Sequence, residues 1–242
     1  MKTKKEIRTE VQVILEERRS RIENSPRGLL SEQLNASLFI NHPYRNPVIG
    51  WKKDIVNLNK SQIKSFYKKW YIPNNAILVI SGDMTMAQLK PLAEKYYGKI
   101  PKKSLVQRSW AKEPQHTASR RIIIKDNRVN HPSWRRTYLA PSLKWGDTRL
   151  AHPLELIADI FGGGTTSLLF KNLVIKKKVA TSIGAYYRGD GRGPGRFIIY
   201  AQPQENVSIE QLEKQIKSEI TLLIQNGISE NELARSKKRL TA

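Results

Sequence analysis

A pair of strand-like segments joined by a glycine-rich loop constrains the fold of this chain most strongly. Residues 180–187 and 196–201 are rich in β-branched and aromatic side chains, and the loop G189-D-G-R-G-P-G195 separates them. A connection this short suits antiparallel strands, because parallel strands need a crossover of a dozen or more residues. The pattern therefore predicts paired antiparallel strands in the second half of the chain.

Helical periodicity and further strand-like segments surround this pair. Helices are expected over residues 4–23, 26–38, 86–97, 147–161, 165–178 and 208–225, over a segment capped by Asn59 or Ser61 that runs to Trp70, and from Ser229 onward. Glu232 is placed to complete a capping box at Ser229. Strands are expected at 76–80, which should be buried, 121–125 and 135–140. Mixed strands and helices with hairpin-like strand pairs favour the α+β class over a parallel βαβ repeat.

A polar segment without periodicity divides the chain. Proline, lysine, serine and glutamine dominate from Ile100 to Ala118. We therefore expect a first domain over residues 1–102, a linker over 103–118 and a second domain over 119–242. Each domain is expected to contain a mostly antiparallel or mixed sheet packed with helices.

The charge of the chain raises the question of an anionic partner. The formal net charge is +22, but lysines and arginines are spread over the whole length without a basic tail. Such charge gives only sequence-independent attraction, so it does not favour a nucleic-acid partner. The chain has no cysteine, which excludes disulfides and Cys-ligated metal sites. No apolar run reaches the roughly 18 residues that a membrane span needs.

Two carboxylates on one helical stripe are the first candidate functional residues. Glu10 and Glu17 are seven residues apart, which is two helical turns, and Val13 and Ile14 complete the stripe. This face is expected to be buried, and a buried carboxylate is costly unless it binds a metal, pairs with a cation or is hydrogen-bonded. The alternative is a charged surface helix solvated by the arginines at 18, 19 and 21. The residues alone leave both alternatives open.

A set of motifs spans nearly the whole chain. They are E10-V-Q-V-I-L-E-E-R18, N35-A-S-L-F39 with H42-P-Y-R-N-P-V-I-G-W51, W70-Y-I-P-N-N-A-I-L-V-I-S-G-D83, F161-G-G-G-T-T-S-L-L-F170, A185-Y-Y187 and E230-N-E-L-A-R-S-K-K-R-L240. In this order they resemble the pitrilysin/insulinase family of zinc peptidases, the inverted HxxEH class that includes the mitochondrial processing peptidase. The resemblance implies two related domains, both incomplete in this chain, and zinc-dependent cleavage of peptides or small unfolded proteins.

The resemblance also implies roles for single residues. In the family, two histidines of HxxEH bind Zn²⁺, the glutamate between them is the general base, and a distant glutamate is the third protein ligand. That ligand corresponds to Glu17, and Glu10 corresponds to a glutamate that supports the site. His42 and Tyr44 lie in a loop close to the family's cleft and are candidate substrate contacts.

The catalytic motif itself is absent from this sequence. His42, His116, His131 and His152 have no second histidine at the required spacing, and H152-P-L-E-L156 has leucine in place of the second ligand. No catalytic residue is therefore assigned, and the chain is expected to be inactive alone. Since the family places HxxEH upstream of the distant glutamate, the chain is expected to be an internal piece of a longer enzyme.

The substrate-binding residues of the family are also replaced. An Arg and a Tyr seven residues apart correspond here to Val174 and Thr181. Some bacterial members divide the zinc site and the Arg/Tyr pair between two subunits, so a second family subunit carrying the pair is the implied partner; a longer parent active as a purified monomer would contradict this. The alternative function is a non-catalytic peptide-binding or assembly subunit of the same fold. The location is expected to be periplasmic or otherwise exported if a missing N-terminus carries a signal, and cytoplasmic if it does not.

Overall fold

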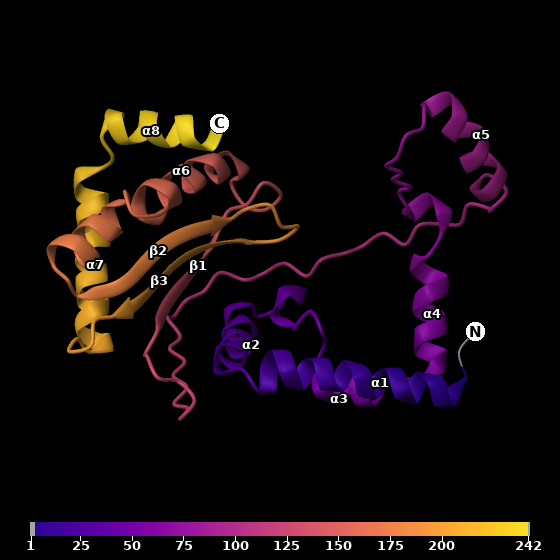
Figure 1. The fold of residues 1–242 in the computed structure, drawn as a ribbon, viewed down its shortest axis with the longest axis horizontal. Coiled ribbons are helices and arrows are strands. Elements are labelled where there is room, and N and C mark those ends of the chain that lie inside the picture. The colour runs from indigo at the N-terminus through magenta and orange to yellow at the C-terminus, as the bar shows by residue number, and fades with distance from the viewer. Residues whose placement is uncertain (1–2, 242) are drawn as a thin grey trace. The chain divides into compact units, whose positions relative to one another are not determined.

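The computed structural model describes residues 3–241 and divides into two units. Unit 1 is Met1–Lys112 and unit 2 is Glu113–Ala242, so the division falls inside the predicted linker. Figure 1 shows α1 to α5 in unit 1, and α6 to α8 with three strands in unit 2. That these units correspond to parts of a first and a second peptidase domain stays a prediction.

Unit 1 is built from helices. They are α1 (Lys4–Arg18), which continues as a π-helix (Arg19–Glu23), α2 (Pro26–Leu38), α3 (Lys52–Val56), α4 (Lys60–Trp70) and α5 (Met86–Tyr97), with short 3₁₀ turns at Pro43–Arg45 and Pro73–Asn75. All four helices predicted in this part of the chain are formed, whereas the five-residue α3 was not predicted. Helix α1 packs against α3, and α2 packs against the π-helix and the first 3₁₀ turn.

Polar side chains at the N-caps fix where these helices begin. Ser25 accepts a hydrogen bond from the backbone N–H of Gly28, and Pro26 follows in the first turn. Of the two caps considered for α4, the structure uses Asn59, whose side chain forms a capping box with Gln62. Each cap satisfies a donor that the first turn leaves without an intrahelical acceptor.

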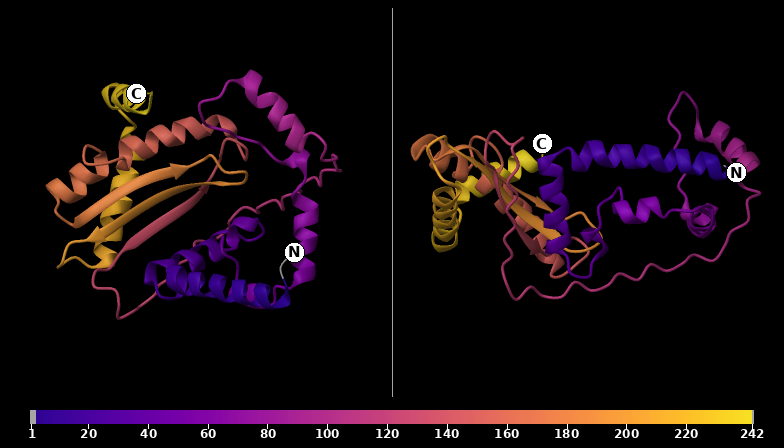
Figure 2. Two further views of the ribbon diagram at one scale, coloured as in Figure 1. Left: turned by 45° about the vertical axis from the view of Figure 1, so that its right-hand side comes forward. Right: turned by 90° about the horizontal axis from the view of Figure 1, so that it is seen from below.

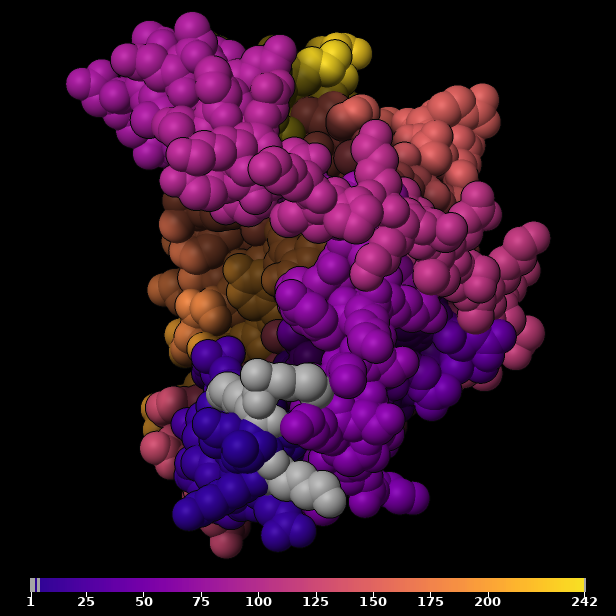
Figure 3. Space-filling view, turned by 90° about the vertical axis from the view of Figure 1, so that its right-hand side faces the viewer, coloured from indigo at the N-terminus to yellow at the C-terminus, as the bar shows by residue number. Residues whose placement is uncertain are grey.

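The strand predicted at residues 76–80 is not formed. These residues belong to no ladder, and Ile77 and Val79 are 91% and 83% exposed, so the expectation of a buried strand was wrong. A strand needs a neighbour to satisfy its backbone N–H and C=O groups, and no strand occurs in residues 3–112. The apolar face of α4 is open too, since Phe66 and Tyr67 are each 59% exposed. Figure 3 shows the surface of this part of unit 1 in magenta.

Unit 2 contains an antiparallel sheet. Its strands are β1 (Trp134–Ala140), β2 (Ala180–Arg188) and β3 (Gly195–Pro203), in the order β1-β3-β2. The predicted pair around the glycine-rich loop is confirmed as β2 and β3. The buried Ser142 holds the loop, because its hydroxyl donates to the carbonyl oxygen of Gly193 at 2.8 Å.

The strand predicted at residues 121–125 is also absent. This segment makes no ladder with β1, and Ile123 is 69% exposed. Its first residue, Arg121, instead forms an ion pair with Glu213 of the helix Ile209–Asn226. The run of three isoleucines therefore indicated an extended segment but not a strand partner.

Helices cover one face of this sheet (Figure 2). They are α6 (Ala151–Gly162), which follows a 3₁₀ turn (Thr148–Leu150) capped by Asp147, a π-helix (Phe170–Lys176) and α7 (Ile209–Asn226). Helix α8 (Glu230–Thr241) packs against α6. The helix expected from residue 165 begins at Leu168 and is mostly π-helical. None of the helices in residues 3–241 is both long and apolar enough to cross a membrane. The α+β class predicted from the sequence is confirmed.

The core of unit 2 lies between the sheet and these helices. The sheet contributes inward-facing residues of β2 and β3, and the helices contribute aliphatic and aromatic side chains. The cluster comprises Phe161, Leu169, Leu173, Ala180, Ile183, Ala185, Ile199, Ala201, Leu212 and Ile216. Since these side chains are 5% exposed or less, their burial supplies the main favourable free energy of this unit.

Two buried carboxylates of α7 form hydrogen bonds with other segments around this core. Glu213 of α7 accepts hydrogen bonds from Arg136 of β1, at 2.7 Å, and from Arg121. Glu219, six residues further along α7, accepts from Asn172 at 2.7 Å and from Lys177 at 2.8 Å. Each acid thus connects α7 to a different segment of the unit.

Gly162 allows the end of α6 to contact the sheet backbone. A Cβ atom on Gly162 would lie 2.0 Å from the backbone nitrogen of Ala185 in β2. We expect Gly162→Ala to destabilise unit 2 by about 3 kcal/mol, at the upper end of overpacking costs, measured by urea unfolding. The control is Gly82→Ala, where nothing lies within 4 Å of the added atom. Equal unfolding midpoints for the two variants would contradict the close contact.

The pKa of Glu213 makes the stability of unit 2 depend on pH. Burial raises this pKa, but the hydrogen bond from Arg121 and the nearby cations together lower it by more, so that the pKa lies below its ordinary value. The ionised carboxylate therefore stabilises the folded unit above the ordinary glutamate pKa of about 4.3, and this stabilisation is lost as the pH falls through the lower folded-state pKa.

Substitution of this carboxylate tests the dependence. We expect Glu213→Gln to cost about 2 kcal/mol at pH 7 and to weaken the loss of stability below pH ~4.3. Hydrogen exchange of the amides in β2 and β3 between pH 7 and acid measures both effects. The exposed Glu210 on the same helix is the control, and Glu210→Gln should change stability by less than about 0.5 kcal/mol. An unchanged acid dependence in Glu213→Gln would show that other groups control it.

Candidate functional site

The two candidate carboxylates lie on the outward face of α1. Glu10 is exposed, the side chain of Glu17 is 43% exposed, and Val13 between them is 58% exposed. The expectation that this stripe is buried was therefore wrong for the described residues. Neighbouring positions on a helix point about 100° apart, and it is Val11 and Arg18, 9% and 5% exposed, that face inward.

Glu17 forms an ion pair with a solvent-exposed cation of the same helical segment. Its Oε1 lies 3.0 Å from the guanidinium of Arg21, one turn further along the chain. The adjacent Glu16 pairs with Arg19 in a similar way. Exposed pairs of this kind contribute about 1 kcal/mol or less, so a stronger cationic ligand would displace them. The roles of Glu17 as third zinc ligand and of Glu10 as its support stay predictions.

The buried side of α1 carries the strongest polar contacts of unit 1. The guanidinium of Arg18 donates two hydrogen bonds to Glu32 of α2, at 2.7 and 3.0 Å, and a third to the carbonyl oxygen of Gly50 at 2.9 Å. The hydrogen bond to Glu32 is the main cause that raises the pKa of Arg18, while burial opposes it. These bonds fix the rotation of α1 and hence point Glu17 outward.

In the alternative of a charged surface helix, Arg18 was expected to be solvated, whereas it is buried. Its spacing from Val11 is seven residues, the same as that of Glu10 and Glu17, so the sequence contains two stripes of equal period. The apolar Val11 at the start of the second stripe was the available signal. The partner Glu32 lies on another helix and had no local signature.

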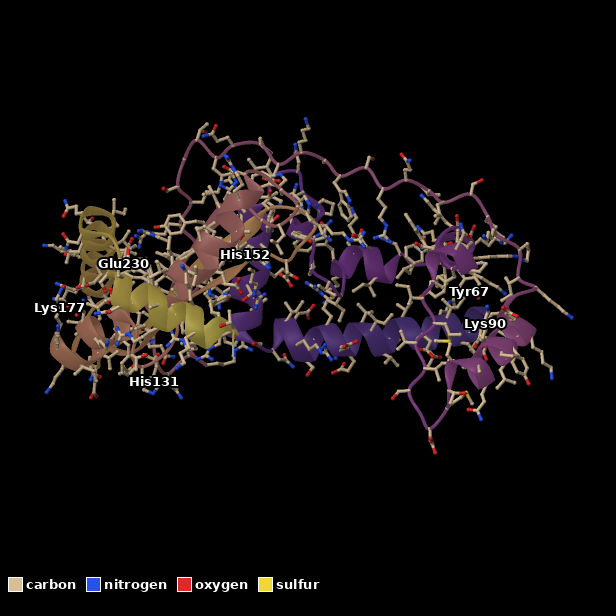
Figure 4. All side chains as sticks on the ribbon, turned by 90° about the horizontal axis from the view of Figure 1, so that it is seen from above. Tyr67, Lys90, His131, His152, Lys177 and Glu230 are labelled. Atoms are coloured by element: carbon tan, nitrogen blue, oxygen red, sulfur yellow. The ribbon has the colours of Figure 1, made fainter. Side chains whose placement is uncertain are left out.

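The described residues do not form a complete zinc site. No group of three or more His, Cys, Asp or Glu side chains in residues 3–241 is arranged to hold a metal ion. His152 and Glu155 of the H152-P-L-E-L156 segment lie 3.7 Å apart on an exposed face of α6, and His131, on a different segment, lies well away from His152 in Figure 4. Catalytic zinc sites use three protein ligands, so the residues present offer a single candidate carboxylate and do not fit the metal alone.

His42 and Tyr44 belong to an aromatic cluster in which His42 is buried. The His42 ring is 2% exposed, stacks on Trp110 with centroids 5.7 Å apart, and lies 4.3 Å from the ring of Tyr44. Its Nδ1 accepts a hydrogen bond from the backbone N–H of Tyr44 at 3.3 Å. The structure thus gives His42 a packing role within unit 1, and contact of either residue with substrate stays a prediction.

The positions of the missing Arg/Tyr pair have structural roles in unit 2. Val174 is partly buried against the core, and the hydroxyl of Thr181 donates to the carbonyl oxygen of Gln202 at 3.4 Å. Neither side chain is long and polar enough to reach a peptide carbonyl beyond the strand.

An open pocket of about 420 Å³ lies beside the acidic stripe. It is lined by Thr9, Gln12, Val13, Leu15, Glu16, Arg19, Glu23 and Lys52. Its charged groups pair with one another, since Glu16 contacts Arg19, and Lys52 lies 3.5 Å from Glu23. Little unbalanced charge remains there to select a ligand, and neither Glu10 nor Glu17 lines it.

Comparison with known proteins supports one family over most of the chain. Residues 57–240 match a model of the peptidase M16 inactive domain. A zinc protease of Helicobacter pylori, PqqE, is 29% identical over 231 residues, which are 94% of this chain and 51% of that protein. The chain therefore spans about half the length of the curated relatives it matches.

Solved structures agree with this match. The crystal structure of a protease from Helicobacter pylori superposes with a TM-score of 0.84 at 27% identity and covers 100% of this chain and 57% of that chain. A peptidase M16 inactive domain from Pseudomonas fluorescens superposes with a TM-score of 0.80 at 20% identity, with 99% and 56% coverage, and supports the fold.

Mutation can distinguish the buried Arg18–Glu32 pair from the exposed ion pairs of α1. We expect Arg18→Met to destabilise α1 and α2 by about 3 kcal/mol, because it leaves the Glu32 carboxylate, whose side chain is 7% exposed, without its cation. Arg19→Met is the matched control on the exposed Arg19–Glu16 pair and should cost less than about 1 kcal/mol. Hydrogen exchange of amides 4–38 measures both. Equal protection in the two variants would contradict a special role for Arg18.

Proposed function

Because the chain belongs to the peptidase M16 family, we propose that it is the part of a zinc-dependent endopeptidase that supplies the third metal ligand and a non-catalytic second peptidase domain. The match of residues 57–240 to the inactive domain of that family carries the proposal. Relatives that are named zinc proteases support Zn²⁺ as the metal of the family. Peptides or small unfolded proteins are the proposed substrates.

The two units divide this role between them. Unit 1 presents Glu17 on the outward face of α1, in the orientation that the Arg18–Glu32 pair holds. Unit 2 contributes a folded sheet domain without a ligand set among its described residues. One carboxylate does not fix zinc in a catalytic geometry, and a general base is needed to activate water. The chain by itself is therefore proposed to be inactive, and no catalytic step is assigned to its residues.

A non-catalytic peptide-binding or assembly subunit is the second candidate. The observation that favours it is the occupation of the Arg/Tyr positions by Val174, which packs on the core, and Thr181. In either case the partner that we propose is a second family subunit that carries the pair. The two candidates differ in whether the chain completes a zinc site when the preceding half of the enzyme is supplied.

A chimera distinguishes them. The part of the Helicobacter pylori protease that precedes the matched region is joined ahead of this chain, and zinc content and cleavage of an unfolded peptide are measured. We expect about one zinc per molecule and chelator-sensitive cleavage in the chimera, and neither in the chain alone. Chelator-sensitive cleavage by the chain alone would overturn the proposed inactivity. A folded chimera without zinc would favour the binding subunit.

Substitutions on α1 test the assignment of the ligand. We expect Glu17→Gln in the chimera to weaken zinc binding by more than about 100-fold, since changes of outer-shell partners alone cost about 10- to 100-fold, and Glu10→Gln to fall within that lower range. The control is Glu16→Gln, which removes an adjacent exposed carboxylate and should leave zinc affinity within about twofold. Zinc titration with a competing chelator measures all three. Full zinc affinity in Glu17→Gln would remove this residue from the ligand set.

A further inference from the structure

The sheet of unit 2 has a second face, opposite the core. Residues directly across an antiparallel ladder point to the same side, so the register defines this face. We call it the arginine face; it comprises Arg135, Thr137 and Leu139 of β1, Arg196, Ile198, Tyr200 and Gln202 of β3, and Ser182, Gly184, Tyr186 and Arg188 of β2. None of these residues belongs to the core cluster under the helices.

Two arginines lie at one end of the arginine face and one lies at the other, and no carboxylate lies on it. Arg188 and Arg196 are directly opposite each other at one end, and Arg135 is opposite Tyr200 at the other. Like charges directly across a ladder are unfavourable for the sheet itself. Arg135 and Arg188 are both exposed, and neither forms an ion pair with any residue that the structure describes. The arrangement therefore favours an anionic group supplied from outside.

An apolar row separates the two cationic ends. Its centre is Ile198, which is 4% exposed and lies between Thr137 and Tyr186 in the register. The rings of Tyr186 and Tyr200 are 6.0 Å apart, and Tyr200 covers Gly184, where an added Cβ would lie 2.5 Å from its hydroxyl oxygen. Along the strands the face thus has cations at its ends and a mostly apolar centre in which Ile198 is buried.

The spacing of the charges fits an extended peptide. The register positions of Arg196 and Tyr200 are four residues apart on β3, about 13 Å at the usual rise of a strand, and Arg135, which is opposite Tyr200, lies one strand to the side on β1. In an extended peptide, side chains four positions apart point to the same side at the same separation, with the side chain two positions along between them. Two carboxylates at that spacing would meet the two cationic ends, and an apolar residue would lie over the central row.

We propose that the arginine face binds extended acidic peptide segments with two carboxylates four positions apart and an apolar residue midway. A nucleic acid fits less well, because single strands bind by stacking bases on aromatic rings and the guanidinium of Arg188 covers the Tyr186 ring at 5.3 Å. As a statement of substrate class, the inference rests on the proposed function. Binding can be measured on the chain alone, so the two fail separately.

The first experiment measures peptide specificity. Fluorescently labelled peptides containing Glu-Ser-Val-Ser-Glu, Gln-Ser-Val-Ser-Gln or Lys-Ser-Val-Ser-Lys are titrated with the whole chain at low and physiological salt, and anisotropy is recorded. We expect the acidic peptide to bind at least tenfold more tightly than the glutamine peptide, and the lysine peptide not to bind. A fourth peptide with the two glutamates adjacent should bind more weakly than the first. Equal binding of the acidic and glutamine peptides would overturn the proposal.

The second experiment locates the site. Arg135→Ala with Arg188→Ala should weaken binding of the acidic peptide at least tenfold, because both side chains are exposed on the face. The matched control, Lys214→Ala with Lys237→Ala, removes the same charge from exposed positions on α7 and α8 and should change binding by less than twofold. Circular dichroism and thermal unfolding confirm that both variants fold.

Two outcomes would reject the arginine face as a peptide site. Equal weakening by the control pair would show attraction to the net charge of the chain. Tighter binding of a single-stranded oligonucleotide that competes with the acidic peptide would assign the face to nucleic acid. Cleavage by the chimera without preference for acidic peptides would reject the substrate class and leave the proposed function intact. Binding of acidic peptides by the chain together with an inactive chimera would reject the proposed function and leave the peptide site intact.

Discussion

Backbone pairing between strands decides which part of this chain has a closed core. In unit 2, two antiparallel ladders satisfy the backbone of β3 on both sides and place Ile199 and Ala201 beneath the helices. Residues 3–112 contain no such ladder, and the apolar side chains of 76–80 and α4 remain exposed there. The same kind of apolar segment is thus core or surface according to whether a partner strand is present.

This dependence also separates what the sequence could predict from what it could not. The helices other than the five-residue α3, and the β2–β3 pair, were predicted because caps, periodicity and turn residues are local. The predictions of strands at 76–80 and 121–125 were wrong because a strand also requires a partner elsewhere in the chain. On α1, the period defined a stripe of Glu10 and Glu17, but the contact of Arg18 with Glu32 decides which side of the helix is buried.

The candidate site shows the same limit. The role of Glu17 comes from the family resemblance, and the structure adds its outward orientation and its weak pairing with Arg21. The packing of His42 on Trp110 could not be predicted from the sequence, because the two residues lie far apart in it, and contact of His42 with substrate stays a prediction. A ligand set drawn from several segments cannot be completed by a chain that carries one of them, so the zinc chemistry belongs to the longer enzyme that we propose.

The open side of β1 has a consequence for the behaviour of the chain in solution. As one of the two outer strands in the order β1-β3-β2, it offers backbone groups outside the ladder that a second copy could join. The exposed Arg135 on that strand and the net charge of +22 oppose such an encounter, since two copies would bring like charges together. Salt screens this repulsion. The tendency of the protein to aggregate should therefore rise with ionic strength.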